Sequence, residues 1–458
     1  MGGGPRPDIL YVVLDAARPD RAGCYGHGPA ATPSLDRLAE DGLRYDQAIA
    51  TSCWTLESVA SLLTGRYPAD HQAHFGTMRL SEGLDTLPSW LRRLGYRTLA
   101  VSGNSAFVGR HTGLHRGFRV FEDVAPEVVP AAEAIGGAGG VLPLKDSAGR
   151  VADAAERLLR LALPSPDPIF LYLHFVDTHL PYYPPQGHAE PFLRRIGATP
   201  DELLRVSQDA AAHFAGRLKG DERSFQILRA LYDGAWSWMD HQLGRVIEVF
   251  GESGRLRDRF TVVTADHGEH LGEGGLMDHA FSLSDVLVRV PLVVNWPGTL
   301  PASTVVTHQV QPLDLFPSLV ERLEGPEAAD RLFPGRCGIL PGDRCPMGRE
   351  WALAQYTEPV NAALRRRYPG EPVPGQSLSM VRGEGWKLVL GGDGSARLHR
   401  LADDPGETRD VARLHPGQLD RLRLRLPGPM APRPRGRSGS PVPWDPELAA
   451  RLAALGYL

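Results

Sequence analysis

The sequence predicts an α/β fold in which a doubly wound, mostly parallel sheet is followed by a smaller C-terminal α+β subdomain. Four short apolar or β-branched runs, at residues 9–14, 98–101, 169–175 and 260–264, predict buried strands. Amphipathic helical patterns lie between these runs. Strands that are buried on both faces and alternate with helices are typical of a parallel sheet covered by helices on either side.

Two of the helical patterns are especially clear. The first begins after Thr32, with Pro33 at its first position, and ends at Gly42, so Thr32 is expected to cap it. The second runs from Trp236 to Phe250 and repeats apolar residues with the 3.6-residue period of a helix packed on a sheet.

The chain divides into three predicted parts. Residues 1–325 form the main domain, with a charged insert at about 189–229 that is either a substrate-covering lid or a plain surface insertion. Residues 326–426 form the C-terminal subdomain, which begins with a Gly/Pro/Arg-rich linker up to residue 349 and has strand-like runs within 377–401. Residues 427–458 are a low-complexity Pro/Arg-rich linker and a short terminal helix.

Composition excludes several classes of function. The 458 residues contain 50 basic and 54 acidic side chains, so no global charge attracts nucleic acid or an anionic membrane. The longest apolar run, at residues 9–14, is far shorter than the roughly 18 residues of a membrane span, and we expect a cytoplasmic protein. Four cysteines without C-x-x-C spacing predict free thiols rather than disulfides or a zinc site; they are Cys24, Cys53, Cys337 and Cys345.

Polar residues follow each of the four predicted strands. Because ligands of such sheets bind beyond the carboxyl ends of the strands, we expect these side chains to meet at one edge. They are Asp15, Asn104, Asp177, His179, Asp266 and His267.

Six motifs in chain order carry a resemblance to a known family. They are DILYVVLDAARPD, SCWTLESVASLLTGRYPADH, FLYLHFVDTHLPYYPP, VVTADHGEHLGEGG, DHAFSLSDVLVRVPLVVNWPG and RLADDPGETRDVA. Together they cover nearly the whole chain, which resembles the sulfatase family of the alkaline phosphatase superfamily. The resemblance implies an ester hydrolase with a divalent cation between strand-end carboxylates and a nucleophile at a helix N-terminus.

The resemblance also implies the cation ligands Asp15, Asp266, His267 and the nucleophile itself. Carboxylate oxygens and one imidazole suit Mg²⁺, Ca²⁺, Mn²⁺ or Zn²⁺, so the metal identity stays open. We expect one cation and do not exclude a second. Family members usually carry two adjacent aspartates at the first ligand, whereas this chain has Ala16 after Asp15, which argues against an all-oxygen calcium site.

The nucleophile position departs from the family. Sulfatases use C/S-x-P-x-R, whose first residue is oxidised to formylglycine, and the matching residues here begin at Thr55, which cannot be converted. Nearby Cys53 lacks the proline and arginine of that motif. Threonine at this position occurs in phosphodiesterases, phosphonate hydrolases and phospho-group transferases of the superfamily. The alternative is that Thr55 is an ordinary helix N-cap.

Other residues are assigned by their match to the family pocket. His179 is expected to donate to an ester oxygen, and His279 is expected to be the acid that protonates the leaving group. Asn104, Arg18 and Asp177 are expected to bind the substrate, although Arg18 could instead neutralise Asp15 and Asp20. His174 is a weaker candidate because its side chain could point into the sheet.

These assignments predict a hydrolase of small anionic esters, either phosphate mono- or diesters or sulfate esters, acting through Thr55. Three alternatives stay open: a sulfatase that works without formylglycine, a phospho-group transferase, and an inactive anion-binding protein. The organic part of the substrate and the oligomeric state are not predicted.

Overall fold

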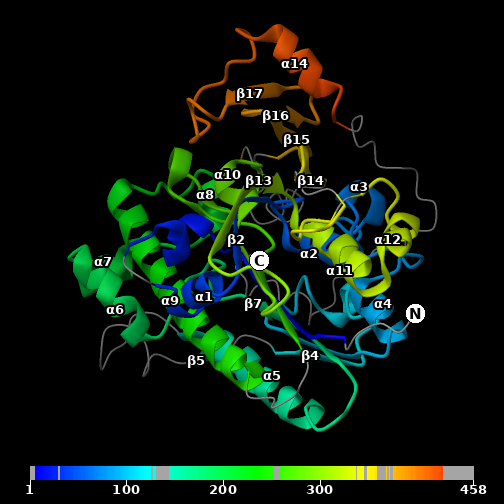
Figure 1. Ribbon diagram of the computed structural model, residues 1–458. Coiled ribbons are helices and arrows are strands. Elements are labelled where there is room, and N and C mark those ends of the chain that lie inside the picture. The colour runs from blue at the N-terminus through cyan, green and yellow to red at the C-terminus, as the bar shows by residue number, and fades with distance from the viewer. Residues whose placement is uncertain are drawn as a thin grey trace.

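The computed structural model of the chain describes residues 6–28, 31–124, 127–129, 144–251, 258–336, 338–344, 348–357, 368, 371 and 375–426. A large central sheet flanked by helices forms the main body, and a small antiparallel sheet lies at one end of it (Figure 1). Cys337, Cys345 and the predicted segment 427–458 lie outside the described residues.

The central sheet has nine strands among the described residues, in the order β11-β2-β12-β8-β1-β7-β3-β4, with β13 beside β2. Their bounds are β1 Asp8–Leu14, β2 Leu43–Ile49, β3 Arg97–Ser102, β4 Val120–Asp123, β7 Ile169–Phe175, β8 Arg259–Ala265, β11 Arg289–Val290, β12 Leu292–Asn295 and β13 Thr304–Val310.

The middle of this sheet is parallel, as predicted. β1 lies between β7 and β8 and is parallel to both, and β3 is parallel to β7 and β4. On the other side, β12 runs antiparallel to β8 and β2, and β11 runs antiparallel to β2. The fold class is therefore confirmed as a large, mostly parallel sheet with a minority of antiparallel strands.

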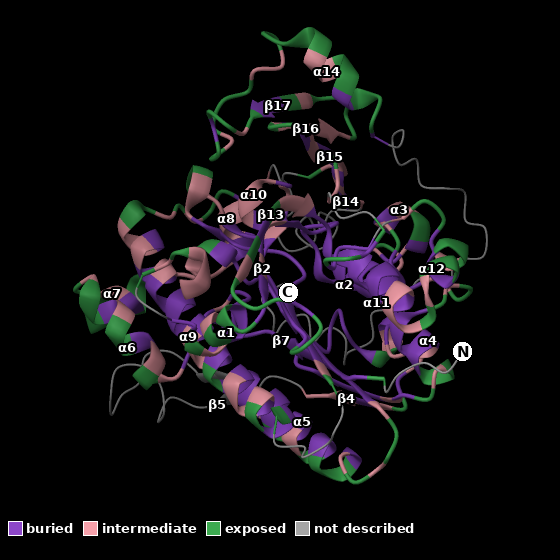
Figure 2. Cartoon of the chain, viewed as in Figure 1, coloured by how far each residue is buried: buried purple, intermediate pink, exposed green. Residues whose placement is uncertain are grey.

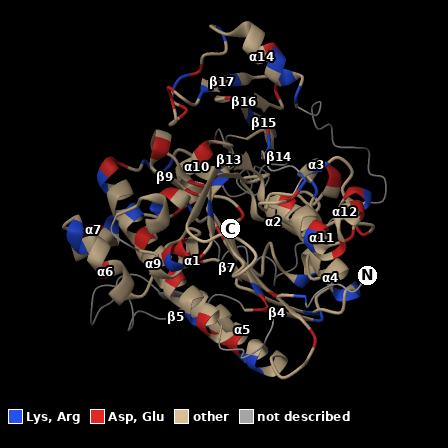
Figure 3. Cartoon of the chain, in the orientation of Figure 1, with Lys and Arg blue, Asp and Glu red and all other residues tan. Residues whose placement is uncertain are grey.

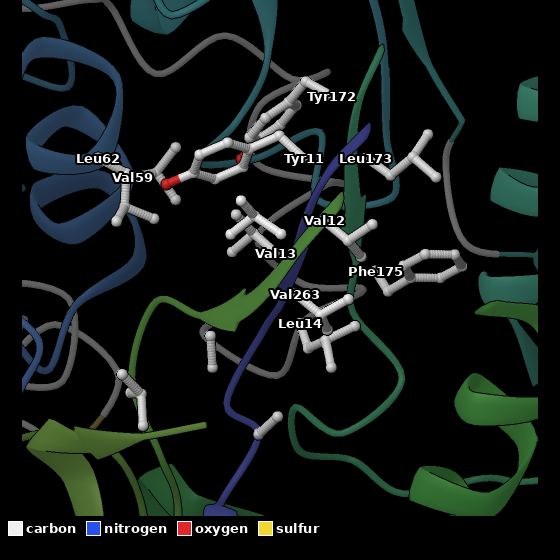
Figure 4. Packing of buried hydrophobic residues seen from close by; sticks show 14 of the residues in the cluster. Tyr11, Val12, Val13, Leu14, Val59, Leu62, Tyr172, Leu173, Phe175 and Val263 are labelled. Carbon is white, nitrogen blue, oxygen red and sulfur yellow. The ribbon is translucent and has the colours of Figure 1, made fainter. Parts of the chain in front are cut away.

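Burial of both faces explains why the central strands have continuous apolar runs. All seven residues of β1 and all seven of β7 are buried (Figure 2). Figure 4 shows Tyr11 of β1 beside Val59 and Leu62 of the helix α2 (Thr55–Thr64), which covers one face of the sheet. This packing fixes α2 relative to the carboxyl end of β1.

Other helices lie around the sheet and at its edges. Their bounds are α1 Pro33–Glu40, α3 Pro68–His71, α4 Leu87–Arg93, α5 Ala148–Ala162, α9 Glu222–Gly251, α10 Asp285–Val288, α11 Leu315–Glu324 and α12 Pro326–Leu332. In the described part of the chain, no helix is both long and apolar enough to cross a membrane. Lys, Arg, Asp and Glu lie on the helices around the sheet (Figure 3).

The N-terminus of α1 is capped differently from the prediction. Thr32 occupies the N-cap position, but its hydroxyl accepts from Gly23 N and donates to the Asp36 carboxylate, and it does not accept from a backbone N–H of the first turn. Asp240 of α9 accepts hydrogen bonds from the backbone N–H groups of Ser34 and Leu35 instead, at 2.8 and 2.9 Å. A carboxylate distant in sequence thus replaces the expected local cap.

The predicted insert contains three short helices, α6 (Gln186–Arg195), α7 (Pro200–Arg205) and α8 (Ala210–Phe214). Its predicted end at residue 229 lies inside α9, which begins at Glu222 and is longer than the sequence pattern indicated. α8 contacts the segment that carries His279: Phe214 packs edge-on against Phe281, and His213 bonds to the carbonyl of Gly275.

The small sheet consists of β14 (Ala352–Tyr356), β15 (Leu378–Gly383), β16 (Trp386–Gly391) and β17 (Ala396–Arg400), all antiparallel, with α14 (Pro416–Arg423) against β16. The linker expected at 325–349 is wrong for most of its length. That stretch contains α12, and Phe333, Ile339 and Leu340 are buried in the main core. Pro326 at the first helical position and the apolar residues after it explain why this segment folds onto the core.

Candidate metal-dependent active site

The register of the parallel strands places the predicted polar residues at the same edge of the sheet. Leu14, the last residue of β1, pairs with Phe175 of β7 and with Ala265 of β8. Asp15 and Asp266 come directly after their strands, and both side chains are fully buried. The expected meeting point at the carboxyl edge of the sheet is therefore present in the structure.

A first group of donor atoms surrounds the imidazole of His267. Its Nε2 lies 3.1 Å from Thr55 Oγ1, 3.6 Å from Asp15 Oδ1 and 3.5 Å from Asp266 Oδ2. The Nδ1–H of His267 donates to the carbonyl of Gly268 at 2.9 Å, so in the neutral ring Nε2 carries the lone pair. The four residues predicted to hold the cation thus converge on one point.

The chemistry of this group fits a divalent cation. Asp15 Oδ1 and Asp266 Oδ2 are buried and have no hydrogen-bond partner among the described residues. Burial, together with the charge of Asp15, raises the pKa of Asp266 well above its usual range. Burial alone would also raise the pKa of Asp15, but its hydrogen bond with His174 and the nearby imidazoles hold it low. A cation would offset the two carboxylates that the fold buries side by side.

Thr55 is the first residue of α2, and Trp54 occupies the N-cap position. No side chain caps this helix, and the Thr55 hydroxyl bonds to His267, so the alternative of an ordinary N-cap is wrong. Ser58, one turn further along, donates from Oγ to the carbonyl of Asp266 at 2.6 Å. This bond ties the start of the helix to the loop that carries the predicted ligands.

A second group of donors lies next to the first and contains His179, Asp278 and His279, all buried. The Nε2 atoms of His179 and His279 are 3.0 Å apart. The ring of His279 stacks on the ring of His267 with centroids 4.1 Å apart, so the two groups are in direct contact. Burial lowers the pKa of His279 well below its usual value, and the neighbouring imidazoles add to that effect.

The structure places the other predicted residues around these groups. Asn104 donates from Nδ2 to Asp15 Oδ2 at 2.6 Å, so its amide orients a predicted cation ligand. The guanidinium of Arg18 contacts Asp20, Glu273 and the carbonyl of Glu269, so the neutralising alternative holds for Asp20, whereas the ion pairs of Asp15 among the described residues are with histidines. Asp177 is buried just beyond the end of β7.

Three buried residues of the site were missed or underrated from the sequence. His174 bonds through Nε2 to Asp15 Oδ2 at 3.0 Å, and its Nδ1 lies 3.1 Å from the hydroxyl of Tyr172. Glu269 accepts a hydrogen bond from Leu180 N, next to His179. Asp278 immediately precedes His279. The sequence could have indicated Glu269 and Asp278. Glu269 lies in DHGE, two residues after His267, and Asp278 lies in MDH, directly before His279.

Cys53 is a poor candidate for the nucleophile. Its thiol is fully buried, and burial raises its pKa well above the usual value, so the reactive thiolate is disfavoured. Its carbonyl accepts a hydrogen bond from His279 Nδ1 at 2.8 Å. Cys53 therefore contributes its backbone to the site.

Comparison with known proteins identifies the family. The family model described as Sulfatase matches residues 7–325. The steryl-sulfatase of Rattus norvegicus is 28% identical over 409 residues, covering 73% of this chain and 70% of that protein. The multifunctional alkaline phosphatase superfamily protein PehA of Trinickia caryophylli is 24% identical over 476 residues, covering 89% and 91%.

Solved structures agree on the fold. The phosphonate monoester hydrolase of Agrobacterium radiobacter superposes with a TM-score of 0.69 at 21% identity, covering 92% of this chain and 96% of that one. The prediction of an ester hydrolase of sulfuric or phosphoric esters is confirmed at the level of the family. The order of strands, the donor groups at their carboxyl ends and these matches lead to one assignment: the chain belongs to the sulfatase family, within the alkaline phosphatase superfamily.

Proposed function

We propose that the chain is a metal-dependent hydrolase that cleaves phosphate mono- or diesters through Thr55. The observation that carries this proposal is the position of Thr55 Oγ1, at the start of α2 and 3.1 Å from His267 Nε2. Two unpartnered carboxylate oxygens, Asp15 Oδ1 and Asp266 Oδ2, lie near the same nitrogen. A hydroxyl in this setting is suited to bind a cation and lose its proton.

Asp15, Asp266, His267 and Thr55 would hold the cation. When bound, it would supply positive charge that lowers the pKa of the Thr55 hydroxyl and polarises the ester oxygens. Two carboxylates and one imidazole accept Mg²⁺, Mn²⁺, Ca²⁺ or Zn²⁺, and the metal identity is left to experiment. His174 and Asn104 both bond to Asp15 Oδ2, which leaves Oδ1 for the cation.

The nucleophile and the helix act together. The Thr55 hydroxyl loses its proton to water, Oγ1 attacks phosphorus, and the bond from phosphorus to the leaving oxygen breaks as that oxygen takes up a proton. Water then attacks the phosphothreonine, which releases phosphate from a monoester or a phosphate monoester from a diester and restores the hydroxyl. The N-terminal dipole of α2, a helix of ten residues, favours the negative charge that develops beside it.

In this proposal, His179 and His279 interact with the leaving-group oxygen of the ester. Each ring donates its Nδ1–H to a backbone carbonyl, of Leu180 and Cys53 respectively, so the Nε2 atoms point at one another. Because each Nδ1 already carries a proton, His279 would donate from Nε2 as an imidazolium; its pKa is low in the free protein, and the negative charge of a bound ester would favour the protonated form that donates to the leaving oxygen. The cytoplasmic location and the small anionic ester partner stay predictions.

Sulfate ester hydrolysis is the second candidate function, because steryl-sulfatase is among the relatives of the chain. A formylglycine hydrate releases sulfate by elimination, whereas a threonine ester must be attacked again at its central atom. Phosphorus accepts a second in-line attack more readily than sulfur, which favours the phosphate ester as the main substrate.

A substrate panel tests this proposal. The purified protein is assayed with aryl phosphate monoester, phosphodiester, phosphonate and sulfate substrates under Mg²⁺, Mn²⁺, Ca²⁺ and Zn²⁺. We expect the largest kcat/KM with a phosphate ester, and a sulfate ester as the best substrate would instead favour the second candidate. Addition of an acceptor alcohol distinguishes a transferase, which would form a new ester.

Trapping identifies the nucleophile. Acid quench during turnover followed by peptide mass analysis should find phosphate on Thr55. Co-expression with a formylglycine-generating enzyme should leave the mass of the peptide containing Cys53 and Thr55 unchanged. An aldehyde on Cys53 would contradict the assignment of the nucleophile.

A further inference from the structure

A pocket of about 220 Å³ lies between the end of α6 and the helix α9, along which α6 packs (Figure 1). Its lining contains none of the residues predicted to act on the ester. The charged and titratable side chains that line it are Arg21, His27, Arg195, Arg229 and Asp233. Three arginines against one aspartate leave an excess of positive charge in a small volume, although the whole chain carries a net charge of −4.

A buried carboxylate orients one of these arginines. Nε and Nη2 of Arg21 donate to the two carboxylate oxygens of Asp233, at 2.8 and 2.6 Å, and Asp233 is buried. His27 Nε2 lies 3.7 Å from the same carboxylate. This bidentate pair fixes the plane of the guanidinium and neutralises Asp233, whereas Nη1 of Arg21 makes no hydrogen bond within the described part of the chain. The Nη1 donor is therefore left for a ligand.

Arg195 is the last residue of α6, where a basic side chain commonly binds the free carbonyls of the helix end. Here Arg223 of α9 takes that role, because its Nη1 and Nη2 donate to the carbonyls of Ile196 and Gly197 at 2.9 and 3.1 Å. Arg223 is itself paired with Glu202 at 2.8 Å. The guanidinium of Arg195 has neither a hydrogen bond nor an ion pair with any residue that the structure describes, and it lines the pocket.

The rest of the lining is an amide and an apolar wall. Gln226 accepts from Arg223 Nη1 through Oε1 at 3.4 Å, and its Nε2 remains a donor. The half-buried side chains of Phe192 and Ile196 lie on the α6 side of the pocket, and Ala230 lies on the α9 side. Polar donors at one part of a concave site with an apolar wall are typical of a site for a small ligand.

We propose that this pocket binds a small oxyanion of the phosphate class, apart from the catalytic centre. Guanidinium groups bind phosphate oxygens through charge-assisted hydrogen bonds, and Arg195 and Arg21 Nη1 supply such donors. The excess of positive charge attracts an anion and repels a cation. The binding site stands on this lining, whereas the choice of phosphate over sulfate rests on the proposed function, in which phosphate is a product.

The same turn of α9 contacts both the pocket and the segment that follows β1. Tyr232, next to Asp233, donates to the carbonyl of Ala16 at 2.8 Å and accepts from Arg18 N at 2.9 Å. Arg21 belongs to this segment, which begins directly after a predicted cation ligand. An anion that binds Arg21 therefore contacts the segment between the pocket and the catalytic centre.

Equilibrium dialysis with radiolabelled inorganic phosphate tests the proposal. The full chain is first stripped with a chelator, because the buried carboxylates of a metal-free catalytic centre disfavour an anion there. We expect one phosphate per chain in the wild type and about tenfold weaker binding in Arg195→Gln and in Arg21→Gln, since each loses charge-assisted hydrogen bonds. Arg194→Gln is the matched control: Arg194 is the preceding residue of α6, pairs with Glu190 and does not line the pocket. No bound phosphate in the wild type, or equal affinity in all three variants, would overturn the proposal.

Phenylphosphonate, which has no ester bond to cleave, distinguishes free phosphate from a phosphate group on an organic molecule. Tighter binding of phenylphosphonate that Phe192→Ala weakens would indicate an organic ligand, and equal binding of the two probes would indicate the free anion.

Thr55→Ala separates the pocket from the catalytic centre. The stripped variant should bind phosphate like the wild type, and loss of binding would place the anion at the catalytic centre and overturn the proposal. If the pocket binds phosphate but Thr55→Ala keeps its turnover with metal, the proposed function fails and the pocket stands.

Discussion

Two clusters of buried charged residues in this protein differ in whether the protein itself supplies the counter-charge. In the small sheet, the fully buried Lys387 on β16 lies 2.8 Å from Asp285 Oδ1 and 2.6 Å from Glu407 Oε1. Arg382 on β15 adds a contact of 3.1 Å to Asp285 Oδ2. At the carboxyl edge of the central sheet, in contrast, Asp15 Oδ1 and Asp266 Oδ2 are buried without a hydrogen-bond partner among the residues that the structure describes.

The difference indicates what each cluster does. The Lys387 cluster joins α10 of the main body to the small sheet, and the protein supplies both signs of charge, so it is complete as folded. The carboxylates at the sheet edge are an incomplete set, because within the described part of the chain their ion pairs are with histidines and include no lysine or arginine. A buried charge that the fold leaves without a counter-charge is suited to a ligand rather than to stability.

The largest effect is expected from Thr55→Ala, which should reduce turnover without reducing stability. Turnover should fall about 10³-fold or more, because the nucleophile acts as a unit with its activating groups. Unfolding free energy should change little, since the Thr55 hydroxyl caps no helix end. Steady-state kinetics and urea unfolding measure both quantities. Thr55→Ser should keep part of the activity, and near-normal turnover of Thr55→Ala would leave attack by water as the mechanism.

Lys387→Met should show the reverse pattern. Removal of Lys387 takes the ion-pair partner from the buried Glu407 and leaves Asp285 paired with Arg382, and unfolding free energy should fall by roughly 3–5 kcal/mol. The folded fraction should retain its kcat within a few-fold. Lys219→Met, at an exposed lysine, is the matched control with an expected change below about 0.5 kcal/mol. Equal stability of the two variants would contradict the structural role of the cluster.

Asp240 is a third arrangement, a buried carboxylate with backbone N–H partners. Burial raises its pKa to about 6, so between about pH 4 and pH 6 the folded state binds more protons than the unfolded state. Its contribution to unfolding free energy therefore decreases as pH rises through this window, by up to about 3 kcal/mol. In Asp240→Asn this decrease is absent, although loss of one cap bond costs about 1 kcal/mol at every pH.

Urea unfolding of wild type and Asp240→Asn at pH 4, 5, 6 and 7 measures this contribution. The wild type minus variant difference should fall with pH and level off above about pH 7. A constant difference would mean that the carboxylate is already ionised throughout.

The smallest expected effect is the change in unfolding free energy caused by Asp266→Asn. The sign of that change is its most informative property. Without metal the amide removes one of two adjacent buried carboxyl charges, so at pH 8 the variant should be more stable than the wild type, by roughly 1–3 kcal/mol. Addition of Mn²⁺ at 100 times its Kd should stabilise the wild type by about 2.7 kcal/mol and the variant far less. Asp153→Asn, at an exposed ion pair with Arg245, should respond to the metal like the wild type. A destabilised metal-free variant would contradict the reading of this cluster as incomplete.

The central strands and their polar ends were predictable because a strand buried on both faces is a continuous apolar run, and its end is marked by the first charged residue. The same continuous apolar run gives no indication of which face of the sheet each side chain lies on. His174 lies within β7, where neighbours on both sides are buried, so the sequence alone could not direct it to Asp15.

Contacts between distant segments account for the other differences. The cap of α1 by Asp240 joins residues about 200 positions apart, which no local pattern reveals. Asp278 belongs to a strand of two residues, too short for periodicity to detect. The segment at 326–344 has the composition of a linker, but its few apolar residues are enough to fold it onto the core.

The hairpin between the two donor groups has a consequence for which changes in the chain are tolerated. β9 (His270–Leu271) pairs with β10 (Met277–Asp278) in the register His270 to Asp278 and Leu271 to Met277, and a turn with Gly272, Gly274 and Gly275 at positive φ closes it. The hairpin thus acts as a spacer that sets the offset between His267 and His279. The exposed Gly274 and Gly275 have open space around them and should accept substitutions that suit positive φ, whereas a side chain at Gly272 would collide with Phe225. Insertion or deletion of one residue would shift the register and separate the stacked imidazoles. Length, more than composition, is therefore the property of this segment that the site depends on.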